Sequence, residues 1–198
     1  MGEKINKKLL VGITGASGSV YAYFFLKELK KLKISSEVII TKTGKIVWEH
    51  EIGFPIDKIL NENLTDKIFF ENEMTAPPAS GSVSYYGMII IPCSMGTLSA
   101  IAHGNARNLL QRAADVTLKE KRPLILVIRE TPLNFIHIKN MELCIQAGAV
   151  IFPAMPAFYH KPRNLEELIL GFVNRIIQFM GFSSENIYKW DGIGKEFE

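Results

Sequence analysis

Short apolar runs alternate along the chain with longer segments of helical periodicity. Five runs rich in Ile, Val and Leu have the length of buried strands: Leu9–Ile13, Glu37–Ile40, Met88–Ile91, Leu124–Ile128 and Ala149–Phe152. Continuous apolar strands are covered on both faces, and the segments between these runs are long enough for crossover helices. The pattern therefore predicts an α/β fold, a single three-layer Rossmann-like or flavodoxin-like domain with a parallel sheet.

Four of the intervening segments have helical length or helical capping signals: Ser19–Lys33, Lys42–Glu51, Asn134–Ala147 and Asn164–Gly181. At the start of the last one, Asn164 is a predicted N-cap and Glu167 its box partner. The Gly- and Ser-rich residues 80–86 predict a loop. Repeats and domain boundaries are not evident in this pattern, so we expect one domain over residues 1–198.

Composition narrows the class of function. The 198 residues are 47% hydrophobic and 22% charged, which suits a globular domain and excludes disorder. Basic and acidic residues number 23 and 20, a net charge of +3, which is too even for a nucleic-acid or membrane-surface footprint. We therefore expect a small molecule as ligand.

Cysteine content and hydropathy bear on location and assembly. The two cysteines, Cys93 and Cys144, give no disulfide framework, and apolar runs such as Gly87–Ile91 are too short to span a membrane. These features favour a cytoplasmic protein. The mean hydropathy of +0.12 is high for such a chain and indicates apolar surface buried in a homo-oligomer.

Ligands of open parallel sheets bind at the carboxyl ends of the strands. The first strand is followed by Thr14–Gly18, where glycines allow close backbone approach and the next helix offers N–H groups to an anion. Gly12, Gly15 and Gly18 are spaced by three, which matches neither the dinucleotide fingerprint nor the Walker pattern. Both a phosphate or flavin loop and an ordinary tight turn fit this segment.

Two further strand ends carry hydroxyl groups. Thr41 and Lys42 follow the second strand, where an NAD-binding fold would place Asp or Glu, so a mononucleotide such as FMN is favoured over NAD. The third strand runs into Pro92–Thr97, which supplies two hydroxyls at a helix start. Within it we interpret Cys93 as a small buried residue and not as a nucleophile.

Charged and phenolic side chains complete the set. Arg129 can hold a phosphate and Glu130 can move a proton, although an ion pair between them is the alternative. The side chains of Arg112, Asp115 and Lys119 share one helical face, which is typical of a solvated surface. Tyr159 can donate a hydrogen bond to a phosphate, and Arg175 lies at the margin of an apolar stripe. The four histidines have no metal-ligand spacing.

Seven motifs together resemble, in the same order, those of the UbiX family of flavin prenyltransferases. They extend over nearly the whole chain, from Leu9 to about Trp190. The motifs are Thr14-Gly15-Ala16-Ser17-Gly18, Ala76-Pro77-Pro78-Ala79-Ser80-Gly81-Ser82, Pro92-Cys93-Ser94-Met95-Gly96-Thr97-Leu98-Ser99, Arg112-Ala113-Ala114-Asp115-Val116, Lys119-Glu120-Lys121-Arg122-Pro123-Leu124, Arg129-Glu130-Thr131-Pro132 and Pro156-Ala157-Phe158-Tyr159-His160.

The resemblance implies a metal-independent enzyme that transfers a dimethylallyl group from dimethylallyl phosphate to N5 and C6 of reduced FMN. Its product, prenylated FMN, would serve a UbiD-type decarboxylase of ubiquinone synthesis or aromatic acid metabolism. The donor remains open between monophosphate and diphosphate. The resemblance also implies a homo-oligomer, commonly a dodecamer, with active sites at subunit interfaces. The segment from about residue 182 would then pack over the site or a neighbouring subunit.

The same resemblance assigns roles residue by residue. The implied FMN-binding residues are Gly15, Ala16, Ser17, Thr41, Ser94, Met95, Gly96, Thr97 and Arg129. Those implied around the substrate phosphate are Arg112, Lys119, Arg129, Tyr159 and Arg175, with Arg112 reaching in from another subunit. The implied catalytic residues are Ser17, Glu51 and Glu130. Trp190 would give aromatic support, and Met74 stands where some relatives carry another Trp.

Two alternatives stay open on the sequence. The related flavin-dependent cysteine decarboxylases share the fold, but they carry an Asn in a late motif that Pro153–Pro156 lacks. A flavodoxin-like electron carrier would use the same fold without covalent change of the flavin. Such carriers are usually acidic and have a longer hydroxyl-rich loop, and neither property is found here.

Overall fold

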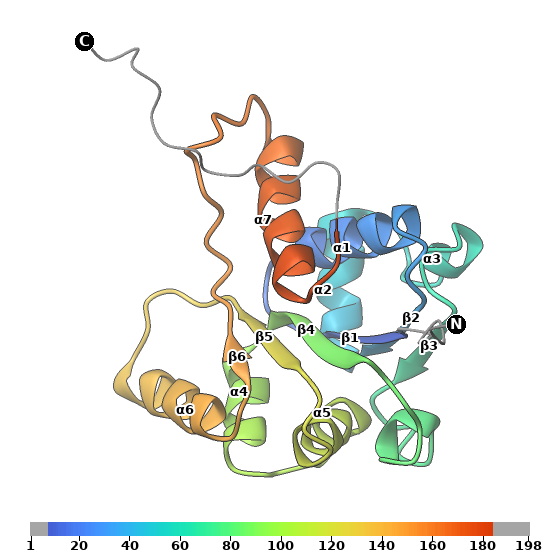
Figure 1. Ribbon diagram of the computed structural model, residues 1–198, viewed down its shortest axis with the longest axis vertical. Coiled ribbons are helices and arrows are strands. Elements are labelled where there is room, and N and C mark those ends of the chain that lie inside the picture. Colours follow the sequence, from blue (N-terminus) through green and yellow to red (C-terminus); the bar gives the residue numbers. More distant parts are fainter. Residues whose placement is uncertain (1–7, 184–198) are drawn as a thin grey trace, which may run out of the picture. The chain divides into compact units, whose positions relative to one another are not determined.

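The computed structural model describes residues 8–183 (Figure 1). The chain forms two compact units that divide between Ala154 and Met155. The first unit contains the whole sheet, and the second contains one long helix. The prediction of one domain over residues 1–198 stays a prediction.

The first unit is built on a parallel sheet of six strands in the order β3-β2-β1-β4-β5-β6. The strands are β1 (Leu9–Ile13), β2 (Ser36–Ile40), β3 (Lys67–Phe70), β4 (Gly87–Cys93), β5 (Leu124–Ile128) and β6 (Val150–Ile151). Every residue of β1, β4 and β5 is buried, as expected for central strands covered on both faces. The five predicted strands and the parallel α/β class are therefore confirmed.

The edge strands show what the apolar pattern did not predict. Strand β3 was missed because Lys67–Phe70 has only two buried residues, Ile68 and Phe69, between exposed ends. Strand β6 has only two residues, shorter than the predicted run Ala149–Phe152. Short, partly exposed edge strands give a weak periodic signal, and they also limit edge-to-edge association.

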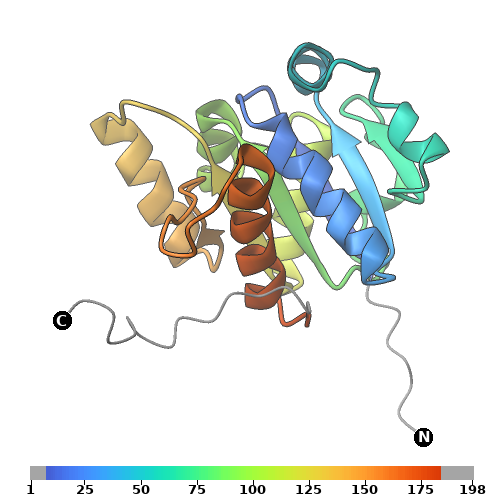
Figure 2. The same cartoon turned by 90° about the horizontal axis from the view of Figure 1, so that it is seen from above.

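Helices cover both faces of the sheet (Figures 1 and 2). Helices α1 and α2 lie on one face, and α4, α5 and α6 lie on the other. Their bounds, with those of two short helical turns, are α1 (Ser19–Lys31), α2 (Lys42–Ile52), α3 (Lys58–Asn61), η1 (Pro77–Ala79), α4 (Met95–Ala102), α5 (Leu109–Lys119) and α6 (Phe135–Gln146). The first unit is thus a three-layer, doubly wound α/β fold.

Helix α5 packs tightly on the sheet at Gly12. A Cβ atom at this position would lie 3.1 Å from Leu110 Cδ1 and 3.2 Å from Ile90 Cγ1. Around this contact, buried residues of β1, β4, β5 and α5 form a continuous apolar core that includes Leu10 and Leu126. The core fixes the strand ends, from which the candidate site residues extend.

Side-chain caps set where several helices begin. Thr41 accepts a hydrogen bond from Gly44 N at α2, and Ser94, Asn108 and Asn134 cap α4, α5 and α6 in the same way. Each cap satisfies a backbone N–H that the helix leaves unpaired. Two of the caps, Thr41 and Ser94, are also predicted FMN-binding residues.

The second unit contains α7 (Leu165–Phe179). Asn164 caps this helix by accepting from Glu167 N at 2.8 Å, as predicted. The Glu167 carboxylate accepts from Arg163 N, one residue earlier than in the expected capping box. None of the described helices has both the length and the apolar character needed to cross a membrane.

Candidate active site

The candidate site lies where the strand order reverses, between β1 and β4. From β1 the chain winds outward through β2 to β3, and from β4 it winds the other way through β5 to β6. Loops that leave the carboxyl ends of two such strands diverge and open a crevice at this switch point. The segments Thr14–Gly18 and Ser94–Thr97 leave β1 and β4, so the structure brings them to the same edge of the sheet.

A single threonine joins these two loops. The Thr14 hydroxyl donates to Pro92 O at 2.7 Å and accepts from Ser94 N at 2.9 Å. The side chain is buried, so both hydrogen bonds form away from bulk water. Thr14 therefore fixes the β1 loop and the β4 loop relative to each other.

Glu51, at the end of α2, occupies the N-terminus of α1. Its Oε2 accepts from Gly18 N at 2.9 Å and from Ser19 N at 2.8 Å. The glycine-rich sequence predicts that these N–H groups face an anionic ligand, and in the structure a carboxylate of the chain itself takes that place. Burial tends to raise the pKa of Glu51, but hydrogen bonds from the Ser17 side chain and from Gly18 and Ser19 outweigh it and lower the pKa.

Ser17 and Glu51, two of the residues predicted to be catalytic, are therefore neighbours. Glu51 is ionised at neutral pH and accepts from the Ser17 hydroxyl. The Ser17 side chain is exposed, so its oxygen remains accessible to a ligand. This pair can accept a proton at Ser17 Oγ while the Ser17 hydrogen passes to Glu51.

Gly15 allows the β1 loop to lie directly against the start of α2. A Cβ atom at Gly15 would come within 2.7 Å of Thr43 Cβ, closer than real Cβ contacts. Thr41, at the end of β2, donates its backbone N–H to Ile13 O at 3.0 Å and is almost fully buried. The ends of β1 and β2 therefore form one packed surface.

The β4 loop presents hydroxyls and an open glycine. Ser94 Oγ accepts from Thr97 N at 3.3 Å and donates to Thr97 Oγ1 at 3.1 Å. Beside them, nothing lies within 4 Å of the position that a Cβ of Gly96 would take. The space over Gly96 can therefore receive a flat ring system close to the backbone.

Arg129 and Glu130 leave the end of β5 beside this loop. Arg129 N donates to Cys93 O at 3.3 Å, and both side chains are exposed. Burial raises the pKa of Tyr21 in the first turn of α1, and the positive charge of Arg129 opposes this rise. Arg129 therefore adds positive charge at the edge of the sheet where the β4 loop begins, and the Glu130 side chain beside it in sequence is exposed.

Cys93 is fully buried between these loops, and burial raises the pKa of its thiol. A buried neutral thiol is a poor nucleophile, which agrees with the interpretation of Cys93 as a packing residue. Burial likewise raises the pKa of Cys144 to about 11. Within residues 8–183, His, Cys, Asp and Glu side chains form no group that could hold a metal ion.

The cations of α5 form a separate cluster against the segment 77–83. Arg112 donates from Nε to Ala79 O at 3.2 Å and from Nη1 to Asp115 Oδ2 at 2.7 Å. Lys119 pairs with Glu120, and Arg122 donates to Gly81 O and Val83 O, both at 2.8 Å. Arg112 and Lys119 therefore share one face, as predicted.

Arg112 and Lys119 lie at different distances from the carboxyl edge. Leu109 N, at the start of α5, donates to Glu71 O directly after β3, so α5 begins at the carboxyl edge. Beyond its end, Pro123 O accepts from Met88 N at 2.9 Å near the start of β4. Lys119 therefore lies near the amino edge, away from the Thr14–Gly18 loop of the same chain.

The remaining predicted residues lie elsewhere. Met74 is partly exposed shortly after β3. In the second unit, Tyr159 packs edge-on against His160 with ring centroids 5.8 Å apart, and the exposed Arg175 donates to Gln178 Oε1 at 3.2 Å. Trp190 and most of the segment from about residue 182 lie outside the described residues.

Comparison with known proteins identifies the family. The family model Flavoprotein matches residues 1–170. The flavin prenyltransferase UbiX of Methanothermobacter thermautotrophicus is 40% identical over 96% of this chain and 98% of its own. The chain belongs to the UbiX family of flavin prenyltransferases.

Solved structures of the family have the same fold. AnUbiX, crystallised with FMN and dimethylallyl pyrophosphate, is 38% identical with a TM-score of 0.90, over 94% of this chain and 98% of its own. A dodecameric FMN-dependent UbiX-like decarboxylase from Escherichia coli O157:H7 is 36% identical with a TM-score of 0.89, over 93% of this chain and 100% of its own. These comparisons do not favour the cysteine decarboxylase or the electron carrier.

The residues of the crevice fit the flavin of this family. The open position over Gly96 suits a planar ring, and the exposed Ser17 hydroxyl and the Arg129 side chain suit its polar edge and an anionic group. Two features of the site were not predicted from the sequence. Thr14 joins the two loops, and the charge of Arg129 acts on Tyr21. Thr14 directly follows a strand and could have been found from that place, whereas Tyr21 carried no such signal.

Proposed function

We propose that this protein is a flavin prenyltransferase that joins the dimethylallyl group of dimethylallyl phosphate to N5 and C6 of reduced FMN. The observation that carries the proposal is the crevice at the β1/β4 switch point, with its open Gly96, exposed Ser17 and nearby Arg129. A relative with a TM-score of 0.90 binds FMN and dimethylallyl pyrophosphate, which supports the same ligands here.

Each group of residues has a defined task in the proposed reaction. The FMN residues are Gly15, Ala16, Ser17, Thr41, Ser94, Met95, Gly96, Thr97 and Arg129, and the loops fixed by Thr14 orient the ring between them. Reduced FMN supplies a nucleophilic N5 and an aromatic C6. The allylic C–O bond breaks, phosphate leaves with the electron pair, and the five-carbon unit bonds to N5, which loses its proton. Protonation of the remaining double bond then lets the same unit close on C6, which loses its hydrogen as a proton.

Positive charge has to stabilise the leaving phosphate, since no metal is invoked. Arg129 supplies it from the crevice, and Arg112, Lys119, Tyr159 and Arg175 complete the phosphate site. Because Lys119 lies near the amino edge, we propose that α5 cations serve the site of a second copy. Glu130 and the Ser17–Glu51 pair move protons, and Trp190 supports the allylic cation through its aromatic face.

This arrangement requires an oligomer, and the dodecameric relative supports one for this chain. The whole chain would act as a single flavin-binding prenyltransferase domain, with its C-terminal segment covering the site or a neighbouring subunit. A UbiD-type decarboxylase would use the product. We place the protein in the cytoplasm, because its two cysteines are free and buried, as is usual in a reducing compartment.

The test is anaerobic incubation of the purified protein with reduced FMN and dimethylallyl monophosphate, followed by release and mass spectrometry of the flavin. We expect a flavin heavier by one five-carbon unit. Parallel reactions with the diphosphate decide between the two donors. Recovery of unmodified flavin with both donors would refute the proposed function.

A further inference from the structure

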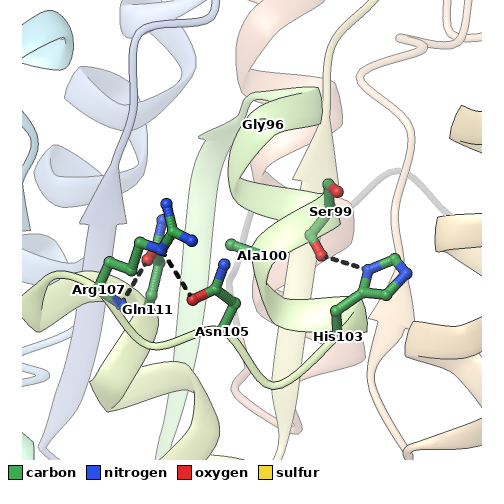
Figure 3. A pocket seen from close by; sticks show the side chains of 7 residues that line it. All are labelled: Gly96, Ser99, Ala100, His103, Asn105, Arg107 and Gln111. Carbon is green, nitrogen blue, oxygen red and sulfur yellow. Dashed lines mark hydrogen bonds between the residues drawn. The ribbon is translucent and has the colours of Figure 1, made fainter.

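A polar groove of about 440 Å³ lies beside α4 and the start of α5 (Figure 3). Six of its residues have no task in the proposed reaction, and the seventh, Gly96, belongs to the β4 loop. The lining residues are Gly96, Ser99, Ala100, His103, Asn105, Arg107 and Gln111. All of them belong to the first unit, so the groove is complete within it.

Arg107 is held by two side-chain amides at one end of this groove. Its backbone N–H donates to Gln111 Oε1 at 2.9 Å, and its Nε donates to Asn105 Oδ1 at 3.1 Å. The first bond holds the main chain of Arg107, and the second fixes the guanidinium on its Nε side and leaves the terminal Nη groups on the other side. The exposed guanidinium therefore has a defined direction within the groove.

The same bonds determine which atoms the amides present. An amide carries an acceptor oxygen on one side and a donor NH₂ on the other. Since Asn105 and Gln111 use their oxygens on Arg107, their nitrogens remain as donors. Figure 3 shows the Asn105 nitrogen and the Arg107 guanidinium pointing to the same side of the chain between α4 and α5.

This end of the groove therefore offers donors and a permanent positive charge. The seven described lining residues include no carboxylate. At the far end, His103 Nδ1 lies 2.8 Å from Ser99 O, an atom that can only accept, so this nitrogen is also a donor and is already occupied. A group with several acceptor oxygens and a negative charge matches the Arg107 end, because Arg binds such groups through two parallel hydrogen bonds.

The rest of the groove has small side chains. Ala100 lies between Arg107 and His103 in Figure 3. The volume is in the range of small-molecule sites and exceeds the needs of a lone inorganic ion. We infer that the groove binds a small organic oxyanion, a phosphomonoester or carboxylate, with its anionic end on Arg107 and its body along Ala100 toward His103, next to the position over Gly96 that is assigned to FMN.

Calorimetric titration of the FMN-loaded protein tests this site, with glycerol 3-phosphate and acetate as probes of the two anion classes. Because the proposed active site also holds phosphate, each titration is repeated with dimethylallyl monophosphate present in excess to fill that site. We expect one binding event per chain for at least one probe. Arg107→Gln should weaken this event at least tenfold, and Arg107→Lys should weaken it less.

Lys30→Gln is the matched control, since it removes the same charge from another groove, lined by Lys27, Lys30 and Lys31 among others. It should leave binding unchanged. Equal weakening by Lys30→Gln, or undiminished binding in Arg107→Gln, would overturn the inference, as would no binding of either probe. Prenyl transfer by the single variant Arg107→Gln is measured separately and should match the unaltered protein, so failure of this site and failure of the proposed function give different results.

Discussion

The β1/β4 crevice and the cation face of α5 are both polar, but they are built differently. In the crevice, Thr14 is about 1% exposed and its partners, Pro92 and Ser94, lie 78 and 80 residues away in sequence. On α5, the Arg112 and Lys119 side chains are 36% and 48% exposed, and each pairs with an acid three or one residues away.

The two regions differ in whether a ligand can rearrange them: the crevice is fixed by one chain, and the ion pairs of α5 are not. Long-range buried hydrogen bonds hold the crevice in one geometry and can be lost only by disrupting the fold. Exposed local ion pairs contribute at most about 1 kcal/mol, so a phosphate can replace them at little cost. The flavin side of the proposed site is therefore set by the fold of one chain, whereas the phosphate side is completed on binding and assembly.

Gly15→Val should produce the largest effect, because it changes the β1 loop where that loop packs against the start of α2. Its side chain would collide with Thr43 at the start of α2, so we expect flavin binding to fall by two orders of magnitude or more, consistent with about 1–3 kcal/mol of overpacking plus a displaced loop. Flavin absorbance of the purified variant measures this. Retention of a full complement of FMN would contradict the packed geometry at this loop.

Arg112→Gln and Glu130→Gln test whether the phosphate side of the proposed site combines residues of two copies of the chain. Each variant alone should lower prenyl transfer by about 100-fold, the usual cost of losing one charged group at a reacting centre. Co-expression of two differently tagged variants, followed by purification on both tags, should give mixed oligomers with activity recovered toward about a quarter of the original, since some sites then combine an intact residue from each copy. Activity no higher than that of the single variants would show that both residues act within one chain.

Gly96→Ala tests whether the flavin ring lies over Gly96 in the crevice. The added methyl meets no protein atom within 4 Å, and alanine favours the first turn of α4 by up to about 1 kcal/mol. We therefore expect an equal or higher melting temperature together with about tenfold weaker FMN binding, as a methyl group would contact the ring. Fluorescence titration of the flavin-free protein gives the affinity. A variant that binds FMN as tightly as before would place the ring elsewhere.

Glu51→Gln should have a small, pH-dependent effect on stability. The pKa of Glu51 is below its ordinary value of 4.5, so its carboxylate stabilises the fold above that pH, and this contribution is lost as pH falls through the lowered pKa. We expect the variant to lose about 1 kcal/mol of unfolding free energy at pH 7, a usual value for a helix cap. The loss should shrink toward pH 3, as followed by urea denaturation.

Glu142→Gln on α6 is the matched control, since Glu142 pairs with Lys139 and Gln146 on an exposed surface. It should show little change at either pH. A Glu51→Gln variant with the pH dependence of the unaltered protein would exclude the carboxylate as the cap of α1.

The fold was predictable to the extent that apolar runs report burial. The central strands β1, β4 and β5 are buried throughout, and α2 ends at Ile52, one residue beyond the predicted Glu51. Strand β3 was missed because half of its residues are exposed. Periodicity identifies elements that are buried by many neighbours and is weak for those at an edge.

The strand ends that carry the candidate site were predictable from the sequence, but the contacts between their residues were not. The rule that ligands bind at carboxyl ends selected Thr41, Ser94 and Arg129. It did not indicate that Glu51 would cap α1, because that contact joins residues 32 and 33 positions apart. Nor did it indicate that Lys119 lies near the opposite edge, since this depends on the direction of α5 across the sheet.

The Thr14 hydroxyl has a consequence for how functional screens of this protein are interpreted. Its hydrogen is used on Pro92 and one lone pair on Ser94, and the side chain is buried, so the group serves the chain and does not face a ligand. Replacement by valine would nevertheless release both loops and abolish flavin retention. A mutational scan scored by flavin content would therefore rank Thr14 together with the residues that contact FMN. A separate measurement of loop geometry distinguishes a residue that joins the two loops from one that binds the flavin.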